Sequence, residues 1–395
     1  MNFLSKKNIS IIGGAGHIGL PLALAFTEKK FNVHLIDKNK KNLNLIKSNK
    51  MPFLEFGAEK SLSKALKKKL LCFETNLEKL YLSKYVIICI GTPINSKLKP
   101  NLKDFFKLIK KLKKYINQNQ LIIVRSSIYP GTIEKIKKIL KNKNNNIVYC
   151  PERIVQSKSL IELPKLPQII ATDKIKIFQE TKTLFQKITA KIIKTSILEA
   201  ELIKLYSNAN RYINFAIANQ LFAICHLHKL NFDRVRSIMQ DGYARNLNLA
   251  KAGLTSGPCL LKDTMQLKSF LNNSFELGTA AMKVNEKIPD LIIEKLKKFS
   301  NFRKKTIGLL GLAFKGETDD IRDSLSIKLL KKLKRLKLNV LVSDEYYKNN
   351  DTISVEKLIL KSKIIIIGAP HKKYLKLKIL KKNKNVINIW GTEYN

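Results

Sequence analysis

Cysteine is scarce in this chain, and tryptophan occurs once. The five cysteines form no CxxC pair and no regular framework within the 395 residues, which excludes a disulfide-stabilised scaffold and favours a reducing compartment. No apolar run reaches membrane-spanning length, so no membrane partner is expected. The first residues lead directly into a strand pattern and leave no room for a signal peptide. These absences together predict a cytoplasmic protein.

Acidic residues are also few: 30 Asp and Glu stand against 75 Lys and Arg, a formal charge of +45. Such a surplus can indicate a nucleic-acid-binding protein, because clustered cations neutralise phosphates. Here lysine far outnumbers arginine, and there is no basic tail and no recognisable nucleic-acid module. We interpret the charge as a compositional bias toward Lys, Asn and Ile on solvated helix faces. No nucleic-acid partner is expected, although the surplus would attract a polyanionic ligand.

A glycine-rich turn joins the first strand pattern, at 8–12, to a helical pattern at 20–28. The turn carries Gly14, Gly16, His17, Ile18 and Gly19. Its glycines permit a tight turn and let a pyrophosphate approach the helix N-terminus. A second strand pattern, at 31–36, ends at Asp37, which can accept bonds from ribose hydroxyls. The motif predicts an NAD site and disfavours NADP, a preference that the nearby Lys38 and Lys40 weaken.

Polar residues follow three further buried strand patterns, which are at 85–90, 121–124 and 147–150. Thr92, Ser127 and Glu152 come after these strands, where an open parallel sheet binds its ligands. An equally good interpretation of each residue alone is a turn or capping role.

Residues 198–229 form one long apolar helical pattern without proline or glycine. Lys204 and Asn208 are four residues apart and therefore share a helix face. Both a solvated stripe and a functional site are compatible with polar residues in this pattern. A helix of this length is typical of a spine between domains and of a dimer surface.

A short loop then leads into another helical pattern, with Pro258 expected at its first position and Cys259 directly after it. The helix dipole and the unpaired N–H groups at this end favour a thiolate. Asp263, four residues after the cysteine, shares its helical face. The alternative interpretation is a buried structural cysteine.

The helical stretch continues from 263 to 299, with interruptions near Asn272 and at Pro289, and a second α/β pattern follows. Its strands are expected at 305–312, 340–343, 364–367 and 386–389, and its first helix at 324–336. The loop after its first strand carries Phe314, Lys315 and Arg322, which offer an aromatic face and two cations to a phosphorylated ligand. An ordinary solvated loop is the alternative.

The predicted fold class is α/β, with two Rossmann-like doubly wound parallel-sheet domains joined by a long central helix in a helical middle domain. The expected bounds are 1–195 for the NAD-binding domain, 196–300 for the helical domain that carries Cys259, and 301–395 for the domain that binds the phosphorylated ligand.

Seven motifs occur in order along the chain: GGAGHIGLPLALAF at 13–26, CIGTP at 89–93, RSSIYPGT at 125–132, CPER at 150–153, EAELIKLYSNANR at 199–211, GPCLLKD at 257–263 and GLAFKGETDDIRDS at 311–324. Together, and over nearly the whole chain, they resemble the UDP-glucose/GDP-mannose dehydrogenase family of nucleotide-sugar 6-dehydrogenases.

The resemblance implies an NAD-dependent, four-electron oxidation of the C6 alcohol of a UDP-sugar to a UDP-uronic acid. Cys259 matches the family's nucleophile, which carries the sugar as a thiohemiacetal and then as a thioester. Lys204 and Asn208 match the pair that stabilises negative charge on the reacting oxygen. Asp263 and Ser127 match groups that orient water or assist proton transfer.

The other matched positions fall into a cofactor site and a substrate site, with Glu152 counted as catalytic as well. The implied cofactor residues are Gly14, Gly16, His17, Ile18, Gly19, Asp37, Thr92, Ser127 and Lys262. The implied substrate residues are Glu152, Arg153, Lys204, Asn208, Arg245, Phe314, Lys315 and Arg322. Arg245 lies where the family supplies an arginine across a homodimer, and no metal is implied.

Four features depart from the family pattern. Ser127 replaces a usual Thr, and Asn388 replaces a common Asp. In the CPER loop, Gln156 stands where some members have Glu, and Ser157 stands where Gly is often found. Residues 171–172 are Ala-Thr where Gly-Gly is usual. No reactive group is lost, but the shape of the sugar pocket is expected to change.

The residues Pro-Glu-Arg at 151–153 favour a UDP-N-acetylhexosamine as substrate, with UDP-glucose next. Two alternatives to this function stay open: a two-electron β-hydroxyacid-type NAD dehydrogenase and a non-catalytic basic nucleotide-binding protein.

Overall fold

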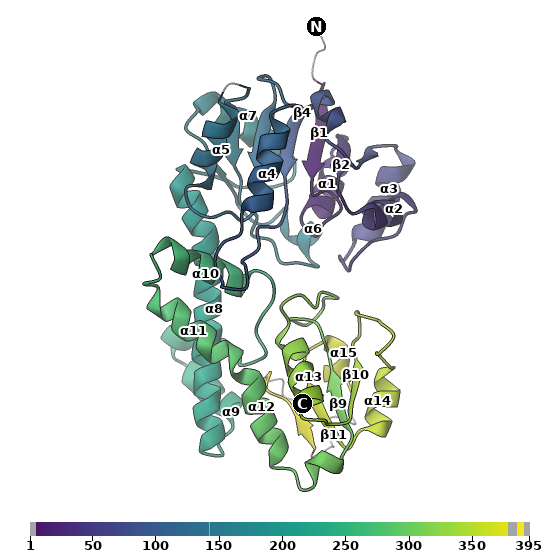
Figure 1. The fold of residues 1–395 in the computed structure, drawn as a ribbon, viewed down its shortest axis with the longest axis vertical. Helices are drawn as coiled ribbons and strands as arrows, with labels where there is room; N and C mark the ends of the chain where they lie inside the picture. Colours follow the sequence, from purple (N-terminus) through teal and green to yellow (C-terminus); the bar gives the residue numbers. More distant parts are fainter. Residues whose placement is uncertain (1–4, 142, 378–384, 391–395) are drawn as a thin grey trace. The chain divides into compact units, whose positions relative to one another are not determined.

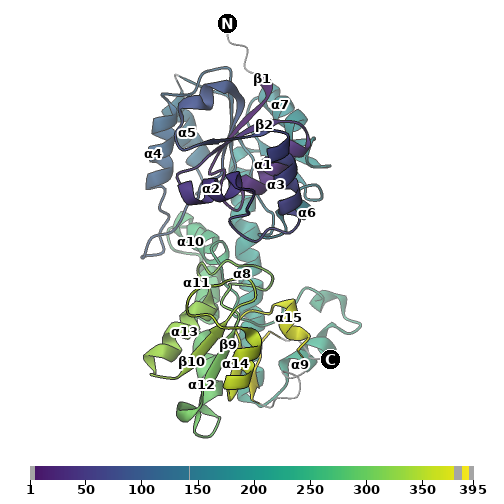
Figure 2. The same cartoon turned by 90° about the vertical axis from the view of Figure 1, so that its right-hand side faces the viewer.

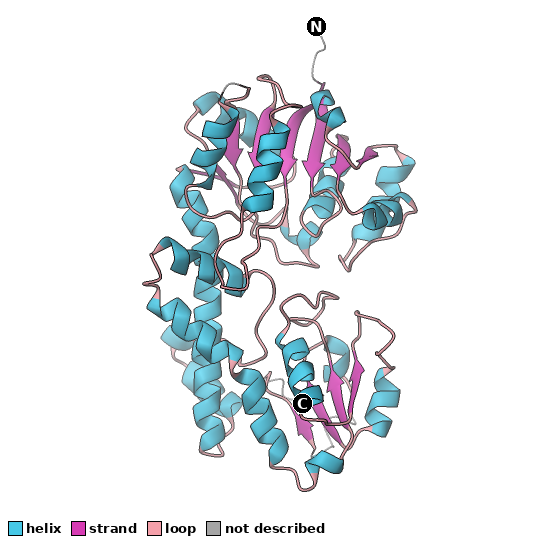
Figure 3. Cartoon of the chain, in the orientation of Figure 1, coloured by secondary structure: helices cyan, strands magenta, loops and turns pink. Residues whose placement is uncertain are grey.

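The computed structural model describes residues 5–141, 143–377 and 385–390. The chain divides into two compact units, Met1–Tyr206 (unit one) and Ser207–Asn395 (unit two). Each unit contains one β-sheet with helices beside it (Figures 1 and 3), so the predicted α/β class is confirmed.

Unit one is built on an eight-stranded sheet with the order β3-β2-β1-β4-β5-β6-β7-β8. Its strands are β1 (Ser5–Ile12), β2 (Asn32–Ile36), β3 (Leu71–Glu74), β4 (Ser83–Ile88), β5 (Leu121–Val124), β6 (Ile147–Tyr149), β7 (Gln168–Ala171) and β8 (Ile192–Thr195). Neighbours pair in parallel except β6 and β7, which are antiparallel. The first six strands have the doubly wound dinucleotide-binding order, which reverses between β1 and β4.

The sequence patterns do not predict β3 or β8. Strand β8 lies at the edge of the sheet and none of its residues is buried, so it lacks the apolar signal of a core strand. Strand β3 has four residues, of which only Leu71 is buried.

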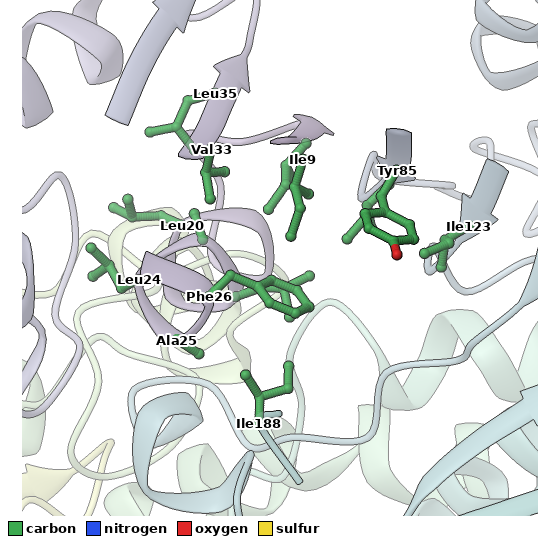
Figure 4. Close-up of a cluster of buried hydrophobic side chains, with 14 of the residues drawn as sticks. Ile9, Leu20, Leu24, Ala25, Phe26, Val33, Leu35, Tyr85, Ile123 and Ile188 are labelled. Atoms are coloured by element: carbon green, nitrogen blue, oxygen red, sulfur yellow. The ribbon is translucent and has the colours of Figure 1, made fainter. Parts of the chain in front are cut away.

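Helices cover both faces of this sheet (Figure 2). They are α1 (Gly19–Glu28), α2 (Lys40–Lys47), α3 (Ala58–Lys67), α4 (Lys103–Leu112), α5 (Thr132–Leu140), α6 (Ser159–Glu162) and α7 (Ile175–Phe185), with the 3-10 helix η1 (Glu78–Leu82). Alternate residues of a strand face opposite sides, so Ile9 packs with Phe26 of α1 in one core (Figure 4), whereas Ile12 packs with Phe105 of α4 in the other.

Helix α8 (Ile197–Leu227) begins in unit one and ends in unit two, which also holds the second sheet. The further helices are α9 (Phe232–Gln240), α10 (Leu260–Phe270), α11 (Glu276–Glu286), α12 (Ile288–Lys297), α13 (Leu325–Arg335), α14 (Val355–Lys361) and α15 (Lys372–Leu375), with the 3-10 helices η2 (Ala244–Asn246) and η3 (Phe302–Lys304). Four parallel strands, β9 (Ile307–Leu310), β10 (Val340–Ser343), β11 (Ile364–Ile367) and β12 (Val386–Ile387), have the order β10-β9-β11-β12.

Two helix starts in unit two illustrate how local sequence sets the boundaries. Ser324 caps α13, because its hydroxyl accepts from the N–H groups of Ser326 and Ile327 at 3.1 and 3.4 Å. Pro289, predicted to interrupt a helix, instead lies in the first turn of α12, where a missing N–H costs nothing. The break between α11 and α12 is at Lys287.

Candidate active site

The glycine turn before α1 is held by backbone contacts that leave no room for side chains at two of its positions. A Cβ on Gly19 would lie 2.2 Å from the carbonyl oxygen of Gly13, and one on Gly14 would lie 2.9 Å from Cα of Leu35. At Gly16 the nearest atom would be 3.4 Å away, an almost ordinary contact. The fold itself therefore requires Gly14 and Gly19, whereas the small residue at Gly16 keeps space open before the helix N-terminus.

Asp37 lies directly after β2 and is half-buried. Its Oδ2 accepts from the N–H of Ala15 at 3.0 Å and its Oδ1 from the N–H of Asn39 at 2.9 Å. Because a carboxylate has about four acceptor sites, Asp37 retains capacity for two ribose hydroxyls. Ile18, the N-cap of α1, has no side-chain oxygen, and the helix makes no side-chain cap bond. These residues suit NAD: an acceptor for the ribose and an uncapped helix N-terminus for the pyrophosphate.

Thr92 and Ser127 come together beyond the carboxyl ends of β4 and β5. The hydroxyl of Thr92, which is buried, donates to the carbonyl oxygen of Ser127. The hydroxyl of Ser127 belongs to a partly exposed residue at the same edge of the sheet. The two positions expected to line the cofactor site are thus neighbours.

Glu152 is buried, and both of its oxygens have partners, one in its own loop and one on Arg125. Oε1 accepts from the N–H groups of Arg153 and Ile154 at 2.7 and 3.0 Å, and Oε2 forms an ion pair with Arg125. Arg125, only 1% exposed, also donates to Oε1 of Gln168 at 2.7 Å. Glu152 therefore orders the loop that carries it, and Arg125 is a partner that the sequence interpretation missed although it begins the motif RSSIYPGT.

The rest of the same loop contacts the glycine turn. Nε2 of Gln156 lies 3.1 Å from Nδ1 of His17, and the ring of His17 packs on Phe53 with centroids 4.1 Å apart. Ser157 has a φ of +71°, the left-handed conformation that glycine adopts most easily. This conformation is consistent with the glycine that the family pattern often has at this position. Arg153 donates to the carbonyl oxygen of Pro167 at 2.6 Å, so it too fixes backbone.

In unit two, Cys259 is exposed and is the N-cap of α10, and the N–H of Asp263 donates to its carbonyl oxygen at 2.9 Å. Pro258 does not occupy the first helical position as predicted, because the chain is still turning there: Gly257 has a φ of +108° and α10 begins at Leu260. The cysteine is not a buried structural residue.

A buried polar cluster lies one turn into α10. Asp263 is completely buried, and its Oδ2 accepts from Nδ2 of Asn208 at 2.5 Å. Its Oδ1 forms an ion pair with Lys262. Lys204 is buried on α8, one turn before Asn208. The structure thus joins Asn208, Asp263 and Lys262, three residues expected in the site, through hydrogen bonds.

The cysteine loop also contacts the loop that follows β9. A Cβ on Gly257 would lie 2.5 Å from the ring of Phe314, and Ser256 accepts from the N–H of Leu325 at 3.1 Å. The ammonium of Lys315 lies 5.8 Å from the Phe314 ring centroid. Unit two therefore places the predicted nucleophile beside the predicted phosphate-binding loop.

Arg322 points its guanidinium at the buried carboxylate of Asp320, with three side-chain hydrogen bonds of 2.6–3.0 Å. Hydrogen bonding to Asp320 raises the pKa of Arg322, and the proximity of Cys259 adds to the shift. Because a guanidinium has five N–H donors, Arg322 can bind Asp320 and still donate to an anion. Arg245, by contrast, is exposed on η2, and its guanidinium carbon lies 5.8 Å from the ring centroid of Tyr243.

Within the described residues, no group of three or more His, Cys, Asp and Glu side chains is placed to hold a metal ion. None of the described helices has the combination of length and apolar character that crossing a bilayer requires.

Models of the UDP-glucose/GDP-mannose dehydrogenase family match the chain in three consecutive segments: the NAD binding domain at 7–189, the central domain at 198–287 and the UDP binding domain at 308–391. The UDP-N-acetyl-D-mannosamine dehydrogenase of Methanocaldococcus jannaschii is 28% identical, over 98% of this chain and 95% of its own length. The UDP-glucose 6-dehydrogenase of Bacillus subtilis is 27% identical, over 85% of this chain and 79% of its own. A solved UDP-D-ManNAc dehydrogenase from Pyrococcus horikoshii superposes with a TM-score of 0.86 at 26% identity, over 96% and 93% of the two chains.

Proposed function

The chain belongs to the UDP-glucose/GDP-mannose dehydrogenase family, and we propose that it oxidises the C6 alcohol of a UDP-sugar to the carboxylate in two NAD-dependent steps through a Cys259 thioester. The observation that carries this proposal is the exposed Cys259 at the N-terminus of α10, one helical turn from the buried Asp263, which is hydrogen-bonded to Asn208. An alcohol dehydrogenase that stops at the aldehyde needs no such thiol.

The residues of unit one would hold NAD, which supplies a hydride acceptor. Gly16 would leave room for the pyrophosphate, Asp37 would accept from the adenosine ribose, and Thr92 and Ser127 would bind NAD beyond the ends of β4 and β5. Around the turn, His17, Ile18 and the loop of Gln156 fix its shape. The carboxylate of Asp37 disfavours a 2′-phosphate, so NAD is preferred to NADP.

Cys259 performs the covalent step. Loss of a hydride and a proton from the alcohol gives an aldehyde, whose carbon the Sγ thiolate attacks to form a C–S bond and a thiohemiacetal oxyanion. Loss of a second hydride leaves a thioester. Water then adds to the thioester carbon and the C–S bond breaks, which releases the carboxylate and the free thiol.

Lys204 and Asn208 donate to the oxygen that bears negative charge in these steps. Asn208 has two amide hydrogens; Asp263 takes one and so aims the other. Asp263 is itself held by its ion pair with Lys262. Glu152, which pairs with Arg125 and accepts from the N–H of Arg153, would help to shape the sugar pocket together with Arg153.

We propose that the domain after residue 300 binds the UDP group through Phe314, Lys315 and Arg322, as the family's UDP binding domain. The sugar is an N-acetylhexosamine in preference to glucose, supported by the Pro-Glu-Arg sequence at 151–153 and by the similarity to the M. jannaschii dehydrogenase. In this proposal, residues 1–195 bind the cofactor, residues 196–300 form the central domain, and residues 301–395 bind UDP.

We further propose a homodimer in a reducing, cytoplasmic compartment. The exposed face of α8 carries large apolar side chains at multiples of the helical turn: Tyr206, Ile217, Ile224 and Leu227. Such an apolar face supports a protein partner, and Arg245 is exposed and available to a second subunit's substrate. All five cysteines are free thiols, which supports the reducing compartment.

The test is the yield of NADH per mole of UDP-GlcNAc, UDP-ManNAc, UDP-glucose and UDP-galactose. A ratio near two is expected for the preferred sugar, because each alcohol loses two hydrides. Cys259→Ala should abolish uronic acid formation and leave NAD binding intact, whereas Cys72→Ala, a matched change in β3, should alter neither. A ratio near one would indicate the two-electron alternative, and no NADH from any UDP-sugar would indicate the non-catalytic one.

A further inference from the structure

The loop at 311–317, which carries Phe314 and Lys315, is tied down at its beginning by a buried aspartate. Asp344 lies directly after β10 and is completely buried. Its Oδ2 accepts from the N–H groups of Leu312 and Ala313 at 2.6 and 3.1 Å. The first two residues after the β9 turn therefore have fixed backbone positions.

The end of the same loop is tied to the same carboxylate through one histidine. The N–H of Glu317 donates to Nδ1 of His371 at 3.0 Å, so Nδ1 carries no proton. The proton of the neutral ring is then on Nε2, which donates to Oδ2 of Asp344 at 3.3 Å. His371 is completely buried, so water does not compete for either bond. One imidazole ring thus connects the two ends of the loop.

The segment before His371 packs against both glycines that bound the loop. A Cβ on Gly311, which has a φ of +91°, would lie 2.5 Å from the N atom of Ala369, and one on Gly316 would lie 2.5 Å from the carbonyl oxygen of Pro370. The loop and the residues after β11 are therefore in backbone contact at each end.

Glu317 has a left-handed φ of +56°, which a non-glycine residue adopts only when other contacts hold it. Its carboxylate accepts from the N–H of Lys372 at 2.9 Å and from the hydroxyl of Tyr346 at 3.2 Å. Burial and the charge of Glu317 raise the pKa of Tyr346 to about 12, so its hydroxyl remains a donor. The rings of Tyr346 and Tyr374 each pack edge-on against His371, with centroids 5.2 Å apart.

Asp344 stays charged in this setting. Burial opposes the charge, but the hydrogen bonds from His371 and the backbone outweigh it and keep the pKa of Asp344 below its ordinary value. A charged acceptor makes stronger hydrogen bonds than a neutral one. The connection from Leu312 through Asp344 and His371 to Glu317 is consequently rigid.

We propose that His371 is a positioning residue for UDP-sugar binding: its neutral ring joins Asp344 to the backbone of Glu317 and thereby holds the 311–317 loop, with Phe314 and Lys315, in the shape that receives the nucleotide. This assignment rests on the proposed function, in which that loop binds UDP. His371 acts through the loop and touches no substrate itself.

The experiment measures UDP binding by titration calorimetry, together with kcat and the KM values for UDP-sugar and NAD, on the full chain. His371→Phe keeps a ring of similar size and removes both hydrogen bonds, so UDP affinity should fall about tenfold, since each bond contributes modestly. KM for the UDP-sugar should rise in parallel, while kcat and KM for NAD change less than about twofold. His371→Asn retains an acceptor near the position of Nδ1 and should restore part of the affinity.

His34→Phe is the matched control, because His34 is also buried, at 7% exposure, but lies on β2 in unit one. It should leave UDP affinity unchanged. Should His371→Phe fail to fold by circular dichroism, Tyr346→Phe removes only the hydroxyl that holds Glu317 and should weaken UDP binding by about threefold.

Wild-type UDP affinity in a folded His371→Phe variant, or in Tyr346→Phe where that replaces it, would overturn the assignment and leave the proposed function standing. A wild-type protein that binds UDP but oxidises no UDP-sugar would overturn the proposed function, and the UDP titrations would still decide the role of His371. A wild-type protein that binds no UDP would overturn both.

Discussion

Removing the buried arginine beside Glu152 should destabilise unit one strongly. In Arg125→Met, the ion pair with Glu152 and the bond to Gln168 are lost, and the carboxylate is left buried with only two backbone N–H donors. Breaking a buried ion pair typically costs about 3–5 kcal/mol, and the remaining backbone donors place this site near about 3 kcal/mol. For a unit of this size the melting temperature should fall by about 6–12 °C.

The cost arises from the stranded carboxylate, so a second change should recover much of it. Glu152→Gln in the Arg125→Met background removes the unpaired charge, and the double variant should be more stable than Arg125→Met alone. Urea unfolding followed by far-ultraviolet circular dichroism gives the four free energies of this cycle. Fluorescence of Trp390, the single tryptophan, follows unit two as a separate signal. A loss below about 1 kcal/mol, or strictly additive effects of the two changes, would refute the coupling.

Three further outcomes test unit one. Gly16→Val should fold but raise KM for NAD about ten- to hundredfold, because its side chain fills the space before α1 at a cost of about 1–3 kcal/mol. Gly14→Ala should instead lower the melting temperature, since its Cβ would overlap the backbone of Leu35. Burial lowers the pKa of His34, and the charge of nearby Glu74 only partly offsets this. The unfolded state therefore takes up a proton first as pH falls below about 6.5, so His34→Leu should lose less stability than wild type between pH 7 and pH 5.5 in thermal melts.

Much of the site could be predicted from local sequence because its geometry is local. The glycine turn with Asp37 is defined by the spacing of one strand, one helix and the next strand, and Cys259 and Asp263 are joined by a single helical turn. The predicted start of that helix at Pro258 was wrong, because the chain still turns at Gly257 with a φ of +108° and α10 begins only at Leu260. Phe314 lies so close to Gly257 that a side chain there has no room, a contact that sequence spacing does not encode.

The partners of buried charges lie outside what local patterns reveal. Arg125 and Glu152 are 27 residues apart, and His371 is 54 residues from the Glu317 backbone that it binds. Which distant residues meet is decided by strand order and by the loops at the carboxyl ends of the strands, and several residues in each loop have suitable chemistry. Strand β8 shows the same limit, since its exposed side chains follow no apolar period and only pairing with β7 identifies it as a strand.

The two sheets use an aspartate at equivalent places for different purposes. Asp37 and Asp344 each follow the second strand of a βαβ unit and each accept an N–H from the loop after its first strand. Asp37 is half-buried and accepts two backbone bonds, so half of its acceptor capacity remains for a ribose.

Asp344 is completely buried, and five donors saturate it: the backbone N–H groups of Leu312, Ala313, Tyr346 and Tyr347 and the ring of His371. No acceptor capacity is left there for a sugar hydroxyl. On the proposed function, the same strand–loop–helix plan presents an open ribose acceptor to the dinucleotide in unit one and a tied loop with Phe314 and Lys315 to the UDP group in unit two.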